Sequence, residues 1–172
     1  FVRWTHYPRD DVDDVAYGTR FFYHAHEPHE MLTQEHGHFH LFARVGEPAQ
    51  RRYAHVAGIS LDDRGTPLRI FTTNQWVTGE YWSPAADMMQ AVQSFGLHTR
   101  GRLAPVARWL TGMVHFYADS VMQLLHERDQ RLLAHAQRMQ QSQDKARADR
   151  SLHIVSEKRL PDHWKHLAKE QV

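Results

Sequence analysis

The chain has 172 residues, of which 41% are hydrophobic, and its formal net charge is +1. This length suffices for one domain with a real core and is short for two, so we expect a single domain over residues 1–172. The 21 basic and 20 acidic residues nearly balance, which argues against nucleic acid or an anionic membrane as a partner. No cysteine is present, so any bound metal must be held by nitrogen and oxygen.

No stretch approaches the roughly 20 apolar residues that a membrane span requires. The first residues carry no signal-peptide pattern, so we expect a cytoplasmic protein. The chain begins with Phe rather than Met, which leaves its native start open.

Residues 1–17 contain an acidic run at Asp10, Asp11, Asp13 and Asp14. The alternating Asp spacing of a calcium loop is absent. We therefore expect a solvated turn or the start of a helix here.

Strand patterns dominate from Gly18 to about Trp82. A tight turn of composition Asp-Asp-Arg-Gly at residues 62–65 joins the last two candidate strands. Hairpin-like connections predict an antiparallel meander of about four strands. The predicted strands are 18–26, 36–45, 53–61 and 67–77.

After Trp82 the apolar spacing changes to that of helices. Ser83-Pro84 predicts one helix start, and a second helix is expected near Pro105 with a break near residues 119–120. The polar segment 137–150 indicates a solvated helical extension or a mobile segment. Residues 152–155 could add a short strand, and Pro161 is expected to open a final helical turn.

The predicted fold class is therefore α+β. A four-stranded antiparallel sheet in the β-rich half, 1–82, would be covered on its apolar face by helices from residues 83–150. Residues 151–172 form a C-terminal tail.

Six histidines fall within residues 24–40, and five of them have even numbers. Because side chains alternate between the faces of a strand, His24 and His26 share one face of the first strand. The same alternation places His36, His38 and His40 on one face of the second. Odd-numbered residues then form an apolar opposite face, at positions 21, 23, 25, 39 and 41.

A hairpin symmetric about Met31 sets His26 against His36, and His24 against His38. Directly opposed Cβ atoms lie about 4.5–5.5 Å apart, which lets facing imidazoles converge on one ion. The expected metal ligands are His24, His26, His36, His38, His40 and Glu30. His55 is a satisfied core histidine unless its face meets the imidazole face, and His163 and His166 are left open.

Nitrogen and oxygen ligands of this kind suit a divalent transition metal, and the sequence does not choose among Fe, Cu and Zn. Glu35 is a candidate catalytic acid or base, and Asn74 a candidate donor of hydrogen bonds to a substrate. Aromatic residues could wall a dry pocket beside the ion, at positions 22, 23, 39, 42, 76 and 82. The expected partner is a small-molecule substrate, and a homo-oligomer is compatible with the sequence.

Gly18, His24, His26, Glu30 and Gly37 follow the spacing Gly-x5-His-x-His-x3-Glu-x6-Gly. This spacing resembles the first metal-binding motif of the cupin superfamily of small β-barrels. The resemblance implies that the two histidines and Glu30 are metal ligands. The second cupin motif, Pro-x-Gly-x2-His-x3-Asn, does not occur, and the helical second half departs from a plain cupin barrel.

The whole chain also resembles a small bacterial family of unknown function, which is built around the same Tyr-His-x-His and Glu-His-Gly-His-Phe-His phrases. This likeness implies one shared domain and supplies no activity.

The favoured function is metal-dependent catalysis on a small organic molecule, with redox chemistry at non-haem iron or copper ahead of hydrolysis at zinc. The reason is that no general base is evident outside the ligand cluster. Two alternatives stay open. One is a non-catalytic metal carrier or sensor, and the other is a structural role in which the histidines satisfy one another without metal.

Overall fold

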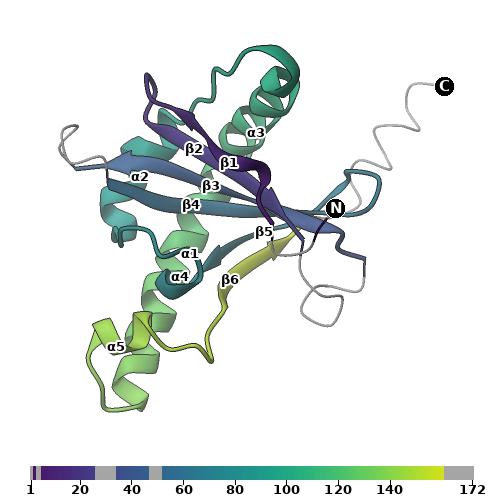
Figure 1. Cartoon of the computed structure of the whole chain (residues 1–172). Coiled ribbons are helices and arrows are strands. Elements are labelled where there is room, and N and C mark those ends of the chain that lie inside the picture. Colours follow the sequence, from purple (N-terminus) through teal and green to yellow (C-terminus); the bar gives the residue numbers. More distant parts are fainter. Residues whose placement is uncertain (1, 3–4, 26–33, 47–51, 161–172) are drawn as a thin grey trace.

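The computed structural model of the protein describes residues 2, 5–25, 34–46 and 52–160. Its main element is an antiparallel sheet of six strands whose order in space follows their order in the chain (Figure 1). The sequence predicted about four strands, so the α+β class is confirmed and the strand number was too low. The strands are β1 (Tyr7–Asp14), β2 (Thr19–His24), β3 (Gly37–Val45), β4 (Arg52–Leu61), β5 (Pro67–Thr73) and β6 (Ile154–Arg159).

The prediction of a turn or helix start in residues 1–17 was wrong, because β1 occupies the acidic run. Its side chains are intermediate or exposed, as expected for an edge strand without a buried apolar face. Arg20 on β2 donates a 2.5 Å hydrogen bond from Nε to Asp13. The acidic run is thus the polar outer edge of the sheet. The other additional strand, β6, pairs with β5 and extends the short strand expected at 152–155.

The predicted hairpin register is confirmed over the whole of β2. Its partners include His24 opposite His38, Phe22 opposite His40, and Thr19 opposite Ala43, and each pair sums to 62. Apolar alternation therefore sufficed to fix the alignment, because a slip by one residue would exchange the two faces of the strand.

A β-bulge interrupts the next pair of strands. Leu41 lies opposite Ala57, but Phe42 lies opposite His55, so Val56 is the additional residue on β4. The bulge moves His55 from the face of Ile59 to the face of Phe42. The alternation assumed from the sequence does not hold across this point.

The helices follow the expected order. Those of the second half are α2 (Ala85–Gln93), a 3₁₀ turn η3 (Gly101–Leu103), α3 (Ala104–Phe116), α4 (Ala118–Arg138) and α5 (Gln143–Arg147). The break between α3 and α4 lies at Tyr117, two residues before the position expected. A four-residue helix, α1 (Gln75–Thr78), replaces the end of the predicted fourth strand. The turn at 62–65 joins β4 and β5 as predicted, and the turn expected at Pro161 lies outside the described residues.

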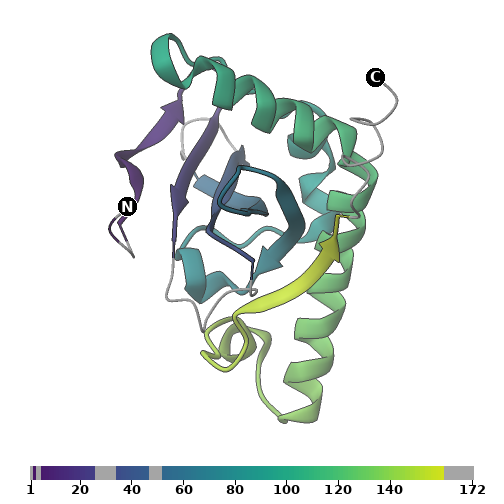
Figure 2. The same cartoon turned by 90° about the vertical axis from the view of Figure 1, so that its right-hand side faces the viewer.

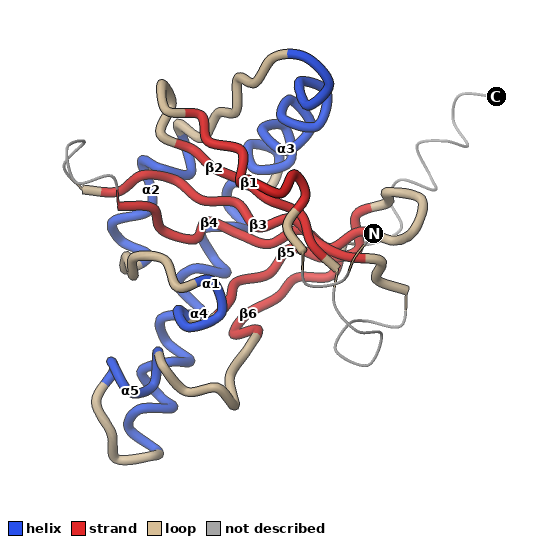
Figure 3. The backbone as a smooth tube through the Cα atoms, viewed as in Figure 1, coloured by secondary structure: helices blue, strands red, loops and turns tan. Residues whose placement is uncertain are grey.

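Helices α2, α3 and α4 lie on one side of the sheet and α1 on the other (Figures 1 and 3). Figure 2 looks nearly along the strands and shows a strongly curled sheet with α3 and α4 on its outer side. The main core fills the space between sheet and helices and includes Phe21, Leu41 and Ile59 together with Met88, Leu110 and Leu125. In the described ranges, none of the helices combines the length and apolarity needed to cross a bilayer.

Candidate metal centre

Three histidines converge on the face of the sheet that the main helices do not cover. His24, His38 and His40 each offer one ring nitrogen, and these three atoms lie within 4.8 Å of one another. The Nε2 atoms of His24 and His38 are 2.9 Å apart. Imidazoles bound to one zinc ion at 2.0–2.1 Å have their nitrogens roughly 3 Å apart, so small ring rotations would complete the set. We call these three residues the triad.

The triad is built by two rows of side chains that run across the sheet. The first row passes from His24 to His38, and then to Ser60 on β4 and Arg69 on β5. Each step is a directly opposed antiparallel pair, so all four side chains share one face. Register alone therefore brings two imidazoles and a guanidinium into line.

The second row contains Phe22, His40, Gly58 and Phe71. Gly58 has room for no side chain, because a Cβ there would lie 2.2 Å from the ring of Phe71. The Phe71 ring consequently packs over the glycine, with its centroid 5.2 Å from the ring of His38 and 5.9 Å from that of His40. This aromatic ring closes one side of the triad.

Burial differs among the three histidines. His38 and His40 are 4% and 1% exposed, whereas His24 is partly exposed. The ring of His6, from the segment before β1, stacks on Phe22 at 3.8 Å and meets His24 edge-on at 5.7 Å. His24 is therefore the most exposed member of the triad.

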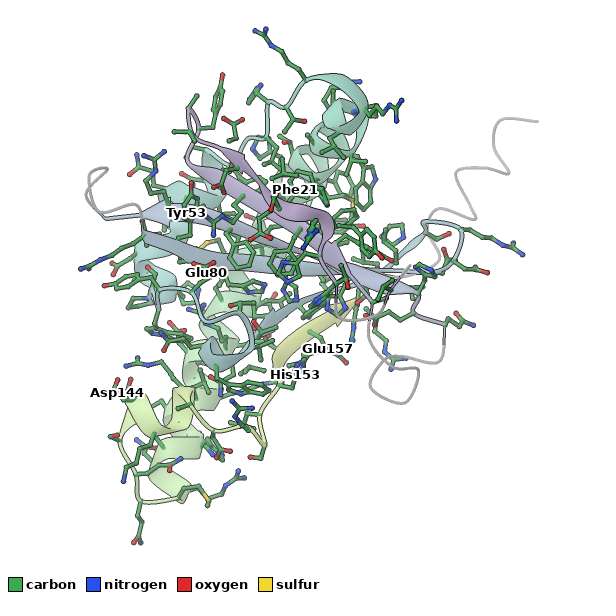
Figure 4. The ribbon with its side chains drawn as sticks, viewed as in Figure 1. Phe21, Tyr53, Glu80, Asp144, His153 and Glu157 are labelled. Carbon is green, nitrogen blue, oxygen red and sulfur yellow. The ribbon has the colours of Figure 1, made fainter. Side chains whose placement is uncertain are left out.

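Glu35 orients His38. One carboxylate oxygen lies 2.6 Å from His38 Nδ1, and the other accepts a 2.9 Å hydrogen bond from Arg69. Arg69 also donates to Ser60 and, at 2.5 Å, to Glu157 on β6, which Figure 4 labels. A carboxylate held against Nδ1 fixes the ring orientation and favours Nε2 as the metal-binding atom.

The charge of Glu35 is stabilised by these partners. Burial alone would raise the pKa of this carboxyl, but the hydrogen bond and charge of His38 and the charge of Arg69 outweigh burial, and the net pKa is lowered. A carboxylate with both oxygens engaged is better suited to orient His38 than to carry protons. This placement differs from the acid or base role expected of Glu35.

His55 supports His40 in a similar way. The bulge at Val56 places the two rings on one face, with His40 Nδ1 3.0 Å from His55 Nε2. His55 is buried, and this burial, followed by the positive charge of Arg128, lowers its pKa to about 3. His55 is therefore neutral.

Two of the remaining expected ligands, His26 and Glu30, lie outside the described residues. His36 is described, and the triad does not include it. It precedes the first residue of β3, and its Nδ1 lies 2.7 Å from the Tyr23 hydroxyl. Strict alternation begins only at Gly37, which explains why His36 departs from the face of His38.

Asn74 has a structural placement. Its side-chain oxygen accepts from the backbone of Gln75 and caps α1, while its amide group donates to the carbonyls of Ala146 and Asp149. These contacts tie β5 to the segment around α5. They engage the groups that were expected to bind substrate.

The aromatic residues that were expected to line one pocket beside the ion lie in several parts of the structure. Phe22 and Phe42 flank the imidazoles, as their even numbers require. Tyr23 and Phe39 lie on the opposite face and line an apolar pocket with Leu103 and Val106. The two tryptophans also lie elsewhere, since Trp76 contacts His153 and Trp82 stacks on Arg128.

Sequence reasoning missed Ser60, Arg69 and the role of His55. The first two could have been found by extending the register. The turn at 62–65 sets Ser60 opposite Arg69, and pairing of the second and third strands sets Ser60 opposite His38. His55 required knowledge of the bulge, for which the sequence carries no evident signal.

A scan of protein families matches residues 1–160 to a domain of unknown function, DUF6969. The chain belongs to this family. The expected membership of an uncharacterised family is thus confirmed, whereas the likeness to cupins is not shown. No curated protein and no solved structure gives a significant match. The family supplies no activity, so the function must be argued from the site.

Proposed function

We propose that this member of DUF6969 binds one divalent transition metal through the triad and uses it to transform a small organic molecule. The observation that carries the proposal is the convergence of three imidazole nitrogens within 4.8 Å on a buried face. Clustered imidazoles in an enclosed place leave many donors and acceptors to satisfy, and a shared cation satisfies three of them at once.

The donor set narrows the choice of metal. Three neutral imidazoles suit Fe(II), Cu(II), Zn(II) or Ni(II), whereas Mg²⁺ and Ca²⁺ prefer oxygen ligands. Glu35 would not touch the ion, but its negative charge would act on the ion through the hydrogen bond to His38. That charge would strengthen His38 as a ligand without itself occupying a coordination position.

A site with three protein ligands would suit catalysis better than storage. Structural zinc sites usually have four protein ligands, while catalytic sites have three and keep a position for water or substrate. In the described part of the chain the cluster has three members. A substrate could then reach the ion from the side of His24, the most exposed of the three.

Redox chemistry is the favoured reaction class. Hydrolysis at zinc usually employs a base beside the metal-bound water. Both oxygens of Glu35 are already engaged by His38 and Arg69. A redox-active metal such as iron or copper could act on an organic substrate without such a base.

The test begins with elemental analysis of protein purified without an affinity tag, followed by titration with Co(II). We expect one metal ion per chain and a cobalt spectrum that changes when azide is added, because azide occupies an open position. His38→Ala should lower the affinity for cobalt more than 100-fold. His36→Ala is the matched control and should leave this affinity within about threefold of the wild-type value.

Three results would redirect the proposal. Equal metal binding by the wild-type and His38→Ala proteins would contradict the metal site. A cobalt spectrum that azide leaves unchanged would favour the carrier or sensor. Zinc as the resident metal, together with hydrolysis of model esters that His38→Ala abolishes, would favour the hydrolase.

A further inference from the structure

His55 lies between the triad and a small, partly open pocket. Its Nε2 faces His40 at 3.0 Å, and His55 is also one of the residues that line the pocket, together with Thr73, Glu80, Trp82 and Arg128. The pocket lies between α1 and α4, because Gln75 and Thr78 of α1 and Arg128 of α4 line it. Figure 4 labels Glu80 there. The ring nitrogen that does not face His40 is Nδ1, which is buried.

A metal on His40 would determine where the proton of His55 sits. Because His40 Nδ1 faces His55, the ion would bind His40 through Nε2. A neutral imidazole bound in this way carries its proton on Nδ1 and donates it. His55 Nε2 must then accept with its lone pair, and the proton of the His55 ring must sit on Nδ1.

The Nδ1–H group of His55 then needs a hydrogen-bond acceptor. Among the described residues, no group lies within hydrogen-bonding reach of His55 Nδ1 or of Thr73 Oγ1, although both atoms are buried. The residues are 7% and 3% exposed. Two such polar atoms lining one pocket would each cost about 1–3 kcal/mol if they stayed unsatisfied.

The size of the pocket indicates what could satisfy them. The space open to the centre of a water molecule is about 10 Å³, which is close to the minimum for one water. An organic ligand is too large for that space. A water there could accept from His55 and exchange a further hydrogen bond with Thr73.

We propose that His55 is a positioning residue for the metal, which accepts a hydrogen bond from His40 and donates its own Nδ1 proton to a water held beside Thr73. The positioning role rests on the proposed metal site, whereas the water site does not depend on it. In this arrangement a line of hydrogen bonds fixes the ring of His40 from behind, as Glu35 fixes that of His38.

Two substitutions separate the two sides of the His55 ring. His55→Gln places an amide oxygen near the position of Nε2 and can still accept from His40. His55→Asn is shorter and retains a polar group only on the pocket side. We expect the zinc affinity of His55→Gln, measured by competition with a chromogenic chelator, to stay within about threefold of wild type, and that of His55→Asn to fall about 10–100-fold.

A spectroscopic measurement on the wild-type protein keeps the proposal testable if a variant fails to fold. Ring-nitrogen NMR spectra of the zinc-loaded protein should show the protons of both His40 and His55 on Nδ1. A proton on Nε2 of His55 would overturn the positioning role, as would equal zinc affinities for the two variants.

The proposed water and the proposed metal site are tested by different experiments. If the wild-type protein bound no zinc, the proposed function and the positioning role would fall together. The water is judged separately by a high-resolution crystal structure, which should show density within hydrogen-bonding distance of both His55 Nδ1 and Thr73 Oγ1. A direct bond between these two atoms would contradict the water.

Discussion

The two faces of the sheet have opposite chemistry although they come from the same strands. On the face covered by α2, α3 and α4, residues such as Phe21, Leu41 and Ile59 pack as an ordinary apolar core. On the other face, His24, His38 and His40 are enclosed by aromatic rings and by a buried ionic network. Stability depends chiefly on the first face, and metal binding should depend on the second. Substitutions on alternate residues of one strand can therefore separate the two properties.

The largest loss of stability is expected on the helix-covered face. Leu41→Ala should lower the free energy of unfolding by about 2–5 kcal/mol, because Leu41 is fully buried and the truncation leaves a cavity. Denaturant titration measures the change. Leu41→Met is the control and should cost less than about 1.5 kcal/mol. If Leu41→Ala abolished zinc binding at temperatures where the variant stays folded, the separation of the faces would be wrong.

The glycine behind Phe71 is expected to have the next largest effect, and on both properties. Gly58→Ala must displace the Phe71 ring, which contacts His38 and His40, because a Cβ would lie 2.2 Å from that ring. We expect a loss of about 1–3 kcal/mol from overpacking, together with weaker metal binding. Gly65→Ala is not a matched control, since Gly65 has a positive φ. Gly112→Ala on α3 is better, because a Cβ there meets no atom within 4 Å, and it should leave metal binding unchanged.

Glu35, which bonds to His38, should affect the affinity for zinc more than the exposed Glu157 does. Glu35→Gln is expected to weaken zinc binding about 10–100-fold, since the amide holds His38 without a charge. Glu157 contacts Arg69 but not the triad, so Glu157→Gln should change zinc affinity less than about threefold. Competition with a chelator measures both. Equal effects of the two variants would show that Arg69, rather than the bond to His38, carries the influence.

The lowered pKa of Glu35 also predicts a pH dependence of stability. A carboxyl whose pKa is lower in the folded state contributes stability above its ordinary value of 4.5, and this contribution is lost as the pH falls through the folded pKa. The stability difference between wild type and Glu35→Gln should therefore shrink as the pH is lowered below that value. Chemical denaturation of metal-free protein at a series of pH values provides the test. A difference that grew on acidification would contradict the assigned direction.

The smallest effect is expected at Tyr23, which belongs to the helix-covered face but bonds to a histidine. Tyr23→Phe removes the hydroxyl that meets His36 and should cost about 0.5–1.5 kcal/mol. Zinc affinity should not change, because His36 is not a member of the triad. A marked loss of zinc affinity in this variant would bring His36 into the metal centre.

The fold could be predicted where apolar alternation was strong. The register of β2 and β3 was predicted to the residue, because Phe21, Phe39 and Leu41 share an apolar face in only one alignment. The edge strand β1 could not be predicted in this way. Its Asp-rich sequence has no buried face, and it is a strand because β2 provides hydrogen-bonding partners. Tertiary pairing overrode local composition there.

Of the candidate site, only the triad could be predicted from the sequence. Parity predicted that His24, His38 and His40 share a face, and cross-strand distances predicted their approach. His36 was placed with them because alternation was extended one residue beyond the start of β3. The groups behind the triad depend on β4 and β5, where the bulge at Val56 reverses the parity of His55. A bulge leaves little trace in the amino-acid pattern, so the groups behind the triad could be identified only from the structure.

The most direct test of the account is a crystal structure of zinc-loaded protein with anomalous diffraction recorded at the zinc edge. The account predicts one strong anomalous peak about 2.0–2.1 Å from a ring nitrogen of each of His24, His38 and His40. An anomalous peak at other residues, with these three rings turned away from one another, would contradict it.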